Sequence, residues 1–299
     1  MKIIQIIHNP TAGDGQHSKE SLIQKVRAAG HGYHYVSTDD PGWKDFHLTD
    51  RDAFLVAGGD GTVRKLALEL LENPSIQKKP IILLPLGTAN NISETFNINP
   101  ETFISKLDLS GSITKYDCGR IRGLDEENYF LEGLGFGVFP ELIKEMEKAE
   151  LDDERPEVEL QKTLVVLLNI VKSFKARKAK IKADSIKIKG SFLLVELLNI
   201  QNIGPNLKLA PRADPGDSFF ELVMIPEENR DEFVTYLEKL IADKSDHLDL
   251  EKFVKTLKVK KVKMKWKGSE MHVDDELVQD YSGKSVTVEV IPEALEFFN

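Results

Sequence analysis

The stretch Ala57-Gly58-Gly59-Asp60-Gly61-Thr62 stands between an apolar run and an amphipathic segment. Residues 53–57 are wholly apolar, which predicts a short buried strand, and apolar residues then recur at helical spacing at Val63, Leu66, Ala67, Leu70 and Leu71. A glycine-rich turn between a strand and a helix lets the backbone approach a ligand closely. Backbone N–H groups and the helix dipole favour a negative charge there, so phosphate is the expected ligand.

The aspartate inside this turn needs a separate explanation. An aspartate would repel a phosphate group directly, so we expect Asp60 to act through a metal ion or a proton. A tight turn that only needs the dihedral freedom of glycine is the simpler alternative. Aspartate between two glycines, followed by Thr62 at a helix start, is a particular combination and favours the functional interpretation.

The bulk properties indicate a globular protein with two domains. The chain has 299 residues, which suggests roughly two domains of about 150 residues each. No apolar run approaches the roughly 20 residues that span a bilayer, and residues 1–8 are too short and strand-like for a signal peptide. Cys118 is the only cysteine, which fits a reducing cytoplasm. The net charge of −9 argues against general nucleic-acid binding.

The first third of the chain alternates strand and helix signals. Strands are predicted at 2–8, 33–38, 53–57 and 80–86, and helices at 18–29 and 63–72. The run at 80–86 is continuously apolar, as in a buried parallel sheet. Ligands of such sheets bind beyond the carboxyl ends of the strands, which is where three glycine-bearing turns follow, at 9–15, 58–62 and 87–91.

From about residue 117 the pattern becomes mainly β. Strands are predicted at 179–183, 185–189, 191–199, 218–225, 257–266 and 285–291, with a glycine-rich strand-like segment at 129–138 and helices at 140–149, 159–174 and 231–242. We therefore predict a Rossmann-like three-layer α/β domain with a mainly parallel sheet at 1–120. A mainly antiparallel β-sandwich with inserted helices follows at 121–299, and its last residues are free to return to the first domain.

Two acidic clusters lie in the second part. Asp214-Pro-Gly-Asp217 could hold a hard cation together with backbone carbonyls, and a hairpin turn with solvated acids is an equal alternative. In His272-Val273-Asp274-Asp275-Glu276, clustered carboxylates could raise one another's pKa and supply a general base. Taken alone, a charged turn is the favoured interpretation of that second cluster.

Lysines are concentrated in two stretches, 172–189 and 258–267. Alternate lysines on a strand are most often its solvated face, or protect a sheet edge against aggregation, and we favour that interpretation. The alternative is attraction to an anionic membrane surface despite the acidic total.

Six segments in order resemble the diacylglycerol kinase catalytic family, in its bacterial lipid-kinase branch within the NAD-kinase-like superfamily. Residues 9–13, Asn-Pro-Thr-Ala-Gly, are similar to the family's opening Asn-Pro-x-Ser/Ala-Gly, and 58–62 to its signature. Residues 84–90, Leu-Pro-Leu-Gly-Thr-Ala-Asn, resemble its Pro-x-Gly-Thr-x-Asn. Ala210-Pro-Arg-Ala213, Asp217 and Val273-Asp274-Asp275-Glu276 resemble its distal Ala-Pro-x-Ala, Asp-Gly and Asp-Gly-Glu elements. The resemblance covers nearly the whole chain.

The resemblance implies an active site between the two domains and a role for each segment. It implies Mg²⁺ near Asp217 with backbone oxygens at Asp214 and Phe219, Glu276 as the base on the acceptor hydroxyl, and Asp60 linked to the metal–phosphate network. It implies that ATP is held by residues of the first domain: Asn9, Pro10, Thr11, Ala12, Gly13, Thr38, Gly58, Gly59, Asp60, Gly61, Thr62, Val63, Arg64, Gly87, Thr88 and Asn90.

Four positions depart from the family pattern. Arg64 stands where the family usually has Asn, and Arg64 is expected either to contact phosphate or simply to be a surface residue. Asn91 replaces a carboxylate, while Ser218 and Asp275 replace glycines, which could shift loop geometry. These changes bear on the acceptor and on full activity more than on nucleotide binding.

The function that these observations favour is an ATP- and Mg²⁺-dependent kinase acting on a hydroxyl of diacylglycerol or a related lipid. An NAD kinase-like enzyme is one alternative, and a nucleotide-binding regulatory protein with little or no catalysis is another. The expected partner is a transient lipid substrate at a membrane surface, with no nucleic acid and no transmembrane segment. A cytoplasmic, peripherally membrane-associated protein fits, and a homodimer is left open.

Overall fold

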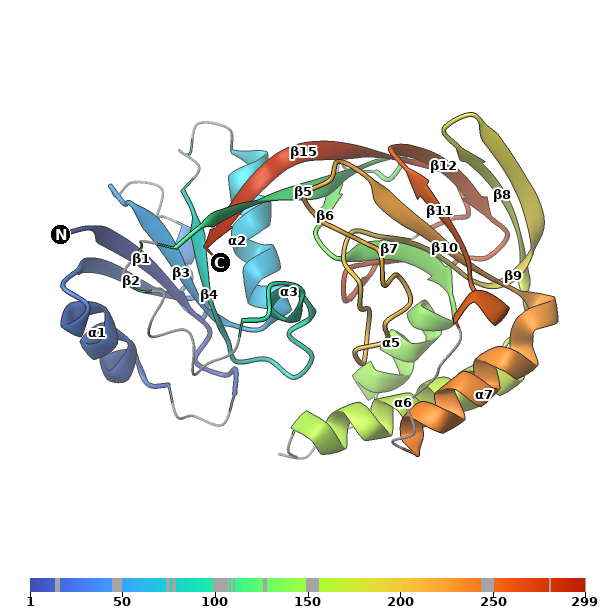
Figure 1. Cartoon of the computed structure of the whole chain (residues 1–299), viewed down its shortest axis with the longest axis horizontal. Helices are drawn as coiled ribbons and strands as arrows, with labels where there is room; N and C mark the ends of the chain where they lie inside the picture. The colour runs from blue at the N-terminus through green and yellow to red at the C-terminus, as the bar shows by residue number, and fades with distance from the viewer. Residues whose placement is uncertain are drawn as a thin grey trace. The chain divides into compact units, whose positions relative to one another are not determined.

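The chain forms two compact units. The computed structural model describes residues 1–13, 17–44, 50–73, 76, 79–98, 107, 109, 111–125, 128–148, 156–242, 250–279 and 281–298. The first unit is Met1–Asp117 with Pro292–Asn299, and the second is Cys118–Ile291. The chain leaves the first unit along strand β5 (Ile113–Arg122) and returns to it along β15 (Val286–Phe298) (Figure 1).

The first unit is built on a parallel sheet. Its strands are β1 (Ile3–His8), β2 (Gly32–Ser37), β3 (Ala53–Gly58) and β4 (Ile81–Pro85), in the order β2-β1-β3-β4. The end of β15 adds a further parallel strand, with Phe297 opposite Ile81. His8 lies opposite both Ser37 and Ala57, and Gly58 lies opposite Pro85, so the carboxyl ends of β1 to β4 are aligned at one edge.

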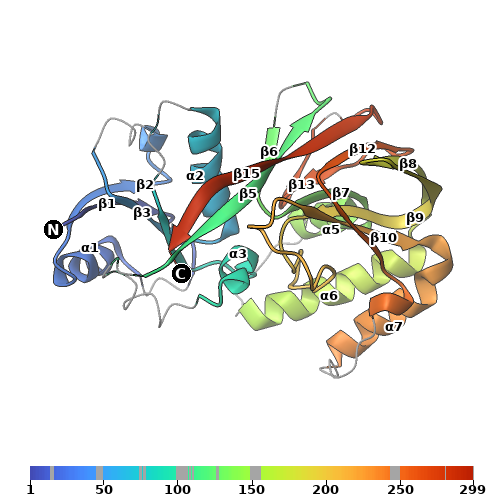
Figure 2. The same ribbon diagram turned by 45° about the horizontal axis from the view of Figure 1, so that its top comes forward.

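Helices cover both faces of this sheet. On one face, α1 (Lys19–Ala28) buries Leu22 and Val26 in a core with alternate residues of the sheet strands. On the other lie α2 (Asp60–Glu72) and α3 (Asn91–Thr95) (Figure 2). The predicted three-layer α/β architecture with parallel strands is confirmed.

Two details of the first unit differ from the sequence-based expectation. The helix predicted from 63 begins at Asp60, so the aspartate, glycine and threonine of the signature form the first turn of α2. The short helix α3 was not predicted, because it has only five residues and follows Asn90 in the left-handed conformation, with φ 52°.

The second unit is an antiparallel β-sandwich. Its strands run in the order β14-β13-β7-β9-β8-β12-β15, with β10 paired to β9 and β11, and β6 paired to β5. Apolar side chains from these strands pack against one another in one hydrophobic core of the unit. The strand bounds are β6 (Asn128–Phe130), β7 (Gly133–Gly137), β8 (Arg177–Ala183), β9 (Ile186–Leu198), β10 (Phe220–Pro226), β11 (Lys255–Val259), β12 (Lys261–Trp266), β13 (His272–Val273) and β14 (Glu276–Leu277).

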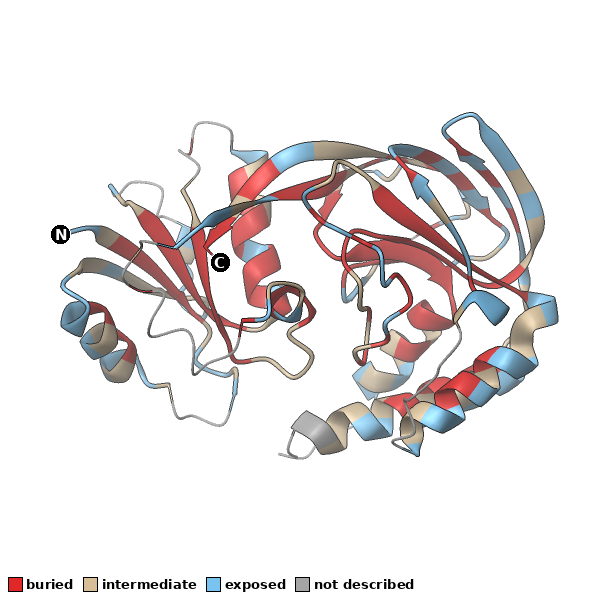
Figure 3. Cartoon of the chain, viewed as in Figure 1, coloured by how far each residue is buried: buried red, intermediate tan, exposed pale blue. Residues whose placement is uncertain are grey.

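Helices pack on the outer face of β9 and β10. Leu193 and Val223 join Leu167 and Phe233 in a second core, so the last half of β9 is buried on both sides (Figure 3). The helices are α5 (Val138–Lys148), α6 (Pro156–Ser173) and α7 (Arg230–Ile241), with short 3-10 turns η2 (Glu227–Asn229) and η3 (Leu250–Lys252). Within the ranges given above, no helix is long and apolar enough to cross a membrane.

Strand boundaries in this unit were predicted less well. The two strands expected at 185–189 and 191–199 are one strand, β9. The strand expected at 257–266 is divided at Lys260 into β11 and β12. Asp184, in the turn between β8 and β9, explains this break, because its carboxylate accepts hydrogen bonds from the backbone N–H groups of Lys260 and Lys261 at 3.2 and 3.0 Å.

Candidate functional site

The predicted nucleotide-binding residues of the first unit gather at the carboxyl edge of its sheet. Residues 9–13 follow β1, Thr38 follows β2, Gly59 follows β3, and residues 86–90 follow β4. Backbone hydrogen bonds tie these segments to neighbouring strands, from the N–H of Asn9 to the carbonyl of Ala57 at 2.9 Å and from that of Thr38 to His8 at 2.8 Å. The structure therefore brings together four segments that are far apart in the sequence.

Two of the turns touch backbone to backbone. A Cβ atom added to Gly59 would lie 2.9 Å from the Cα atom of Gly87, and one added to Gly87 would lie 2.7 Å from that of Gly59. The Oδ1 atom of Asn90 accepts the N–H of Gly87 at 2.9 Å, and its Nδ2 donates to the carbonyl of Gly87 at 2.5 Å. Glycine at 59 and 87 is thus required by the fold itself.

The first turn has similar internal restraints. Gly13 has a φ of 78°, and a Cβ added to it would lie 3.3 Å from the carbonyl oxygen of Leu86. Asn9 Oδ1 accepts hydrogen bonds from the backbone N–H and the hydroxyl of Thr11 at 3.1 and 2.8 Å. Pro10 and Ala12 complete this turn. The asparagine therefore shapes the loop before any ligand is considered.

Gly61 is different from its neighbours. It lies exposed in the first turn of α2, its φ is not positive, and a Cβ added to it would meet no atom within 4 Å. The residue before the helix, Gly59, supplies no capping side chain. Glycine costs about 1 kcal/mol relative to alanine in a helix, so the fold alone does not explain this choice. Close approach of a ligand to a helix N-terminus is one reason why glycine occurs at such positions.

Asp60 joins the signature to the next helix. Its side chain is buried, and its two carboxylate oxygens accept the backbone N–H groups of Asn91 at 2.8 Å and Ile92 at 3.1 Å. The carboxylate thereby caps α3, whose dipole stabilises the negative charge. Because α3 was not predicted, this role of Asp60 was not expected.

The remaining signature residues lie on buried positions of α2. Thr62 fills the space above Gly58, where a Cβ would overlap its side chain. Val63 is also buried. Arg64 is only 8% exposed, so the alternative that it is simply a surface residue is wrong.

In the second unit, the predicted base Glu276 lies on a tight hairpin. β13 and β14 pair with Val273 opposite Glu276, which leaves Asp274 and Asp275 as a two-residue turn. Asp274 takes the left-handed conformation, with φ 51°. Asp275, which stands in place of a family glycine, is not among the described residues with positive φ, so this substitution needs no strained backbone. Glu276 is exposed.

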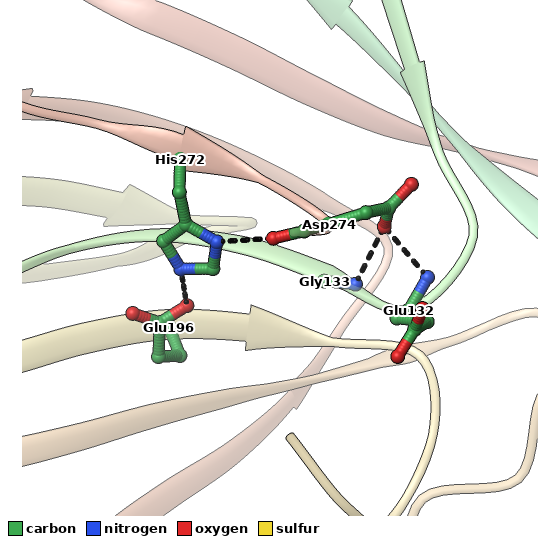
Figure 4. A network of polar contacts seen from close by, with 5 residues as sticks. All are labelled: Glu132, Gly133, Glu196, His272 and Asp274. Atoms are coloured by element: carbon green, nitrogen blue, oxygen red, sulfur yellow. Dashed lines mark hydrogen bonds and ion pairs between the residues drawn. The ribbon is translucent and has the colours of Figure 1, made fainter. Parts of the chain in front are cut away.

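Asp274 anchors this hairpin to the sandwich. Its Oδ1 atom accepts the backbone N–H group of Leu131 at 3.1 Å. The same atom accepts those of Glu132 and Gly133 at 2.9 and 3.2 Å (Figure 4). Its own N–H donates to the carbonyl of Gly133 at 2.7 Å. Asp274, which was predicted only as a member of a carboxylate cluster, is thus a buried structural residue two positions before the exposed Glu276.

A row across three strands supports the same hairpin. His272 of β13 lies opposite Gly135 of β7, and Gly135 lies opposite Glu196 of β9. Because glycine has no side chain, the histidine and glutamate meet above it, and His272 Nε2 is 2.9 Å from Glu196 Oε2. A Cβ at Gly135 would overlap the Glu196 carboxylate.

This buried pair retains a proton. His272 Nδ1 lies 2.7 Å from the carbonyl oxygen of Asp274, which only accepts, so Nδ1 carries hydrogen (Figure 4). Burial raises the pKa of Glu196. Burial alone would lower the pKa of His272, but the charge and hydrogen bond of Glu196 reverse this and raise it. Nε2 and Oε2 therefore share a further proton.

Sequence reasoning missed Gly135 and Glu196, although signals existed. Glycines alternate at 133, 135 and 137, which places three of them on one face of a strand. Glu196 interrupts the apolar run Leu193-Leu-Val-Glu-Leu-Leu198, and an acid in a strand buried on both faces needs a buried partner.

The turn predicted to bind Mg²⁺ is occupied by its own contacts. Asp214 Oδ1 accepts the N–H of Gly216, and Asp217 Oδ1 accepts that of Phe219, both at 2.9 Å. Asp217 Oδ2 lies 2.5 Å from Nζ of Lys258. Ser218, which replaces a family glycine, keeps the left-handed conformation with φ 63°.

These donors do not assemble a metal site as they stand. Carboxylate and carbonyl oxygens suit Mg²⁺, but the carboxylate of Asp217 is already paired with an ammonium group. The turn therefore does not fit a bound Mg²⁺ ion in this conformation.

Comparison with protein families agrees with both units. Residues 4–121 match the diacylglycerol kinase catalytic domain, and residues 149–299 match the YegS C-terminal NAD kinase beta sandwich-like domain. The chain belongs to the diacylglycerol kinase family.

Known members of this family resemble the chain over most of its length. A diacylglycerol kinase of Bacillus subtilis (strain 168) is 25% identical over 245 residues, which are 78% of this chain and 77% of that protein. One from Staphylococcus aureus (strain bovine RF122 / ET3-1) is 26% identical over 237 residues, covering 76% and 72%. The family resemblance that the sequence motifs indicated is confirmed.

Solved structures support the fold. The structure of a diacylglycerol kinase from Bacillus anthracis str. Sterne superposes with a TM-score of 0.69 at 19% identity, covering 100% of this chain and 97% of that one. Yeast NADH kinase complexed with NADH superposes with a TM-score of 0.56 at 11% identity, covering 100% and 82%. The fold of this diacylglycerol kinase family member is therefore shared with the NAD-kinase-like proteins.

Proposed function

We propose that the chain is an ATP- and Mg²⁺-dependent kinase that transfers the γ-phosphoryl group to a hydroxyl of diacylglycerol or a related lipid. The observation that carries this proposal is the gathering of the glycine turns at the carboxyl ends of β1, β3 and β4, with the exposed Gly61 at the start of α2. Family membership and relatives named diacylglycerol kinase support the class of acceptor.

In this proposal the first unit holds the nucleotide. Residues 9–13, Thr38, the signature 58–64 and residues 87, 88 and 90 surround the triphosphate, with backbone N–H groups and the dipole of α2 neutralising its charge. Positioning and charge neutralisation are most of what phosphoryl transfer requires of a protein. Asp60, held against α3, keeps the signature in register with the 87–90 turn.

The second unit supplies proton acceptance. Glu276 takes the proton of the acceptor hydroxyl as its oxygen attacks the γ-phosphorus and the bond to the β-phosphate oxygen breaks, leaving ADP. Its hairpin is held rigid by Asp274 and by the row of His272 and Glu196. Magnesium belongs to this proposal as part of the Mg-ATP complex, and we assign it no protein ligand.

A lysine-rich sheet face supports contact with an anionic membrane. Lysines on β8, β9 and β12 lie directly opposite one another in two rows, Lys265–Lys180–Lys189 and Lys263–Lys182–Lys187. A depression of about 470 Å³ lies among the lysines of the first row. Like charges opposite each other destabilise a sheet, so a bound anionic surface explains this arrangement better than solvation alone.

Liposome co-sedimentation tests this contact. Reversing the charge of Lys180 and Lys182 should weaken binding to vesicles with anionic lipid and leave binding to neutral vesicles unchanged. Charge reversal of Lys162 and Lys239, exposed on α6 and α7, is the matched control. If both pairs of charge reversals weaken vesicle binding equally, the lysines of β8, β9 and β12 are simply a solvated face of the sheet.

An acceptor panel tests the kinase proposal. Transfer of the γ-phosphate from ATP is measured to diacylglycerol, related lipids and NAD, and we expect product only with a lipid. Glu276→Gln should lower turnover strongly while ATP affinity stays nearly intact, whereas Glu232→Gln, an exposed carboxylate on α7, should change neither. Phosphorylation of NAD alone contradicts the lipid assignment. A melting temperature raised by ATP with no product from any acceptor would favour a regulatory nucleotide-binding protein.

A further inference from the structure

The side chain of Lys258 reaches into the turn that family resemblance assigns to a metal ion. Its ammonium lies 2.5 Å from Asp217 Oδ2 and 5.1 Å from the centroid of the Phe219 ring. An ammonium over an aromatic face is attracted by the ring, and one beside a carboxylate forms a charge-assisted hydrogen bond. Both contacts come from the same 214–219 turn.

Strand pairing fixes this position. Lys258 of β11 lies directly opposite Glu221 of β10, and the next pair in the ladder is Val259 opposite Phe220. A slip of one residue would turn Lys258 to the other face of the sheet. Glu221 is only 8% exposed, so the ammonium also balances a largely buried acid next to the turn. The register of the sheet therefore delivers one cation to two carboxylates.

Both carboxylate oxygens of Asp217 take part in these contacts. Its Oδ1 atom accepts the N–H of Phe219 at 2.9 Å and its Oδ2 atom contacts the ammonium. Ser218, which lies between Asp217 and Phe219 in the chain, has a φ of 63°, a conformation that glycine adopts more easily. A cation on Asp217 helps to hold the turn in this shape.

We infer that Lys258 is a built-in cation that takes the place of a divalent metal ion at the 214–219 turn. It neutralises Asp217 and fixes the turn without any ion from solution. This inference needs no assumption about the reaction or the acceptor. It can therefore fail while the proposed kinase function stands, and it can hold if the chain proves not to be a kinase.

Thermal unfolding of the full chain without nucleotide tests the inference. The melting temperature is measured in EDTA and in millimolar Mg²⁺ or Ca²⁺. The wild type should melt at the same temperature in both. Lys258→Met should melt several degrees lower in EDTA and be restored toward the wild-type value by a divalent ion, because Asp217 is then free to bind it. Asp217→Asn added to Lys258→Met should abolish the restoration.

Lys260→Met is the matched control. Lys260 lies 4.6 Å from the same Phe219 ring, so this variant removes a neighbouring lysine and a ring contact but leaves the Asp217 pair intact. It should show no dependence on divalent ions. A wild type stabilised by Mg²⁺ through Asp217, or a Lys258→Met variant that no ion restores, would overturn the inference. If Lys258→Met does not fold, calorimetric titration of the wild type decides, since Mg²⁺ binding that Asp217→Asn removes contradicts a built-in cation.

Discussion

Replacing Gly61 by alanine should make the protein more stable and a worse nucleotide binder. A Cβ at this position meets no atom within 4 Å and the backbone is not left-handed, so the methyl group costs the fold nothing. Alanine is up to about 1 kcal/mol better than glycine in a helix, which for a chain of this size raises the melting temperature by about 2–4 °C. The same methyl group would stand where a phosphate is proposed to approach the N-terminus of α2.

The loss in affinity follows from the contacts that the methyl group prevents. One hydrogen bond to a charged group contributes about 1.5–3 kcal/mol to binding. Its loss would raise the dissociation constant for Mg-ATP by about ten- to hundredfold. Isothermal titration calorimetry measures the dissociation constant for ATP, and differential scanning calorimetry measures the melting temperature of the same sample.

Two other glycines serve as controls. Gly87→Ala places a Cβ 2.7 Å from the Cα atom of Gly59 and should lower the melting temperature as well as the affinity. Gly32→Ala, whose Cβ meets atoms at an ordinary 3.7 Å, should leave the ATP affinity unchanged and should not lower the melting temperature. A Gly61→Ala variant that binds ATP as tightly as the wild type refutes the phosphate position. One that melts as low as Gly87→Ala refutes the claim that the space above Gly61 is open.

Three further outcomes are expected from the buried contacts. Gly135→Ala should lower the free energy of unfolding by about 3–5 kcal/mol in a denaturant titration, because it separates Glu196 from His272. The same substitution should cost much less in a Glu196→Ala background, where the overlapping carboxylate is gone. Equal costs in the two backgrounds would contradict the overlap. The raised pKa of His272 means that the folded protein keeps this proton to a higher pH than the unfolded chain, so the stability it contributes is complete below the ordinary histidine pKa of 6.5 and is lost as pH rises through the raised value. The raised pKa of Glu196 adds a contribution of the same sign, which begins to fall above the ordinary glutamate pKa of 4.5. A His272→Gln/Glu196→Gln variant should show a flatter fall in the free energy of unfolding with rising pH, and an unchanged slope would exclude a retained proton. Asp60→Ala should cost about 1–3 kcal/mol by uncapping α3, and a neutral result in the same assay would show that the cap contributes nothing.

The fold of the first unit was predictable because its signals are local. Mainly apolar segments followed by glycine-bearing turns predicted β1, β3 and β4, and helical spacing predicted α1 and α2. The position of the candidate nucleotide site followed from one rule, that ligands of parallel sheets lie beyond the carboxyl ends of the strands. Helix α3 could not be predicted, because its start depends on the distant carboxylate of Asp60 rather than on a capping residue of its own.

The second unit shows where sequence patterns stop being informative. The expected strand at 257–266 breaks at Lys260 because Asp184, more than seventy residues earlier, accepts the backbone N–H groups there. The expected metal turn is filled by Lys258, which belongs to the second lysine-rich stretch and was grouped there with the other lysines. Each of these contacts joins residues that are far apart in the sequence, and the local sequence around either residue does not indicate its partner.

Three glycines of the chain also show that the sequence alone does not distinguish a glycine that the fold requires from one that it does not. In sequence, Gly59, Gly61 and Gly135 look alike, as glycines beside buried strands or helices. In the structure, Gly59 is required by backbone contact with Gly87, and Gly135 by a side-chain pair that crosses above it. Gly61 has no such neighbour. A glycine that the fold does not need, at a helix N-terminus where it costs stability, fits the proposal that a phosphate group approaches there, and that proposal depends on this residue more than on any other in the signature.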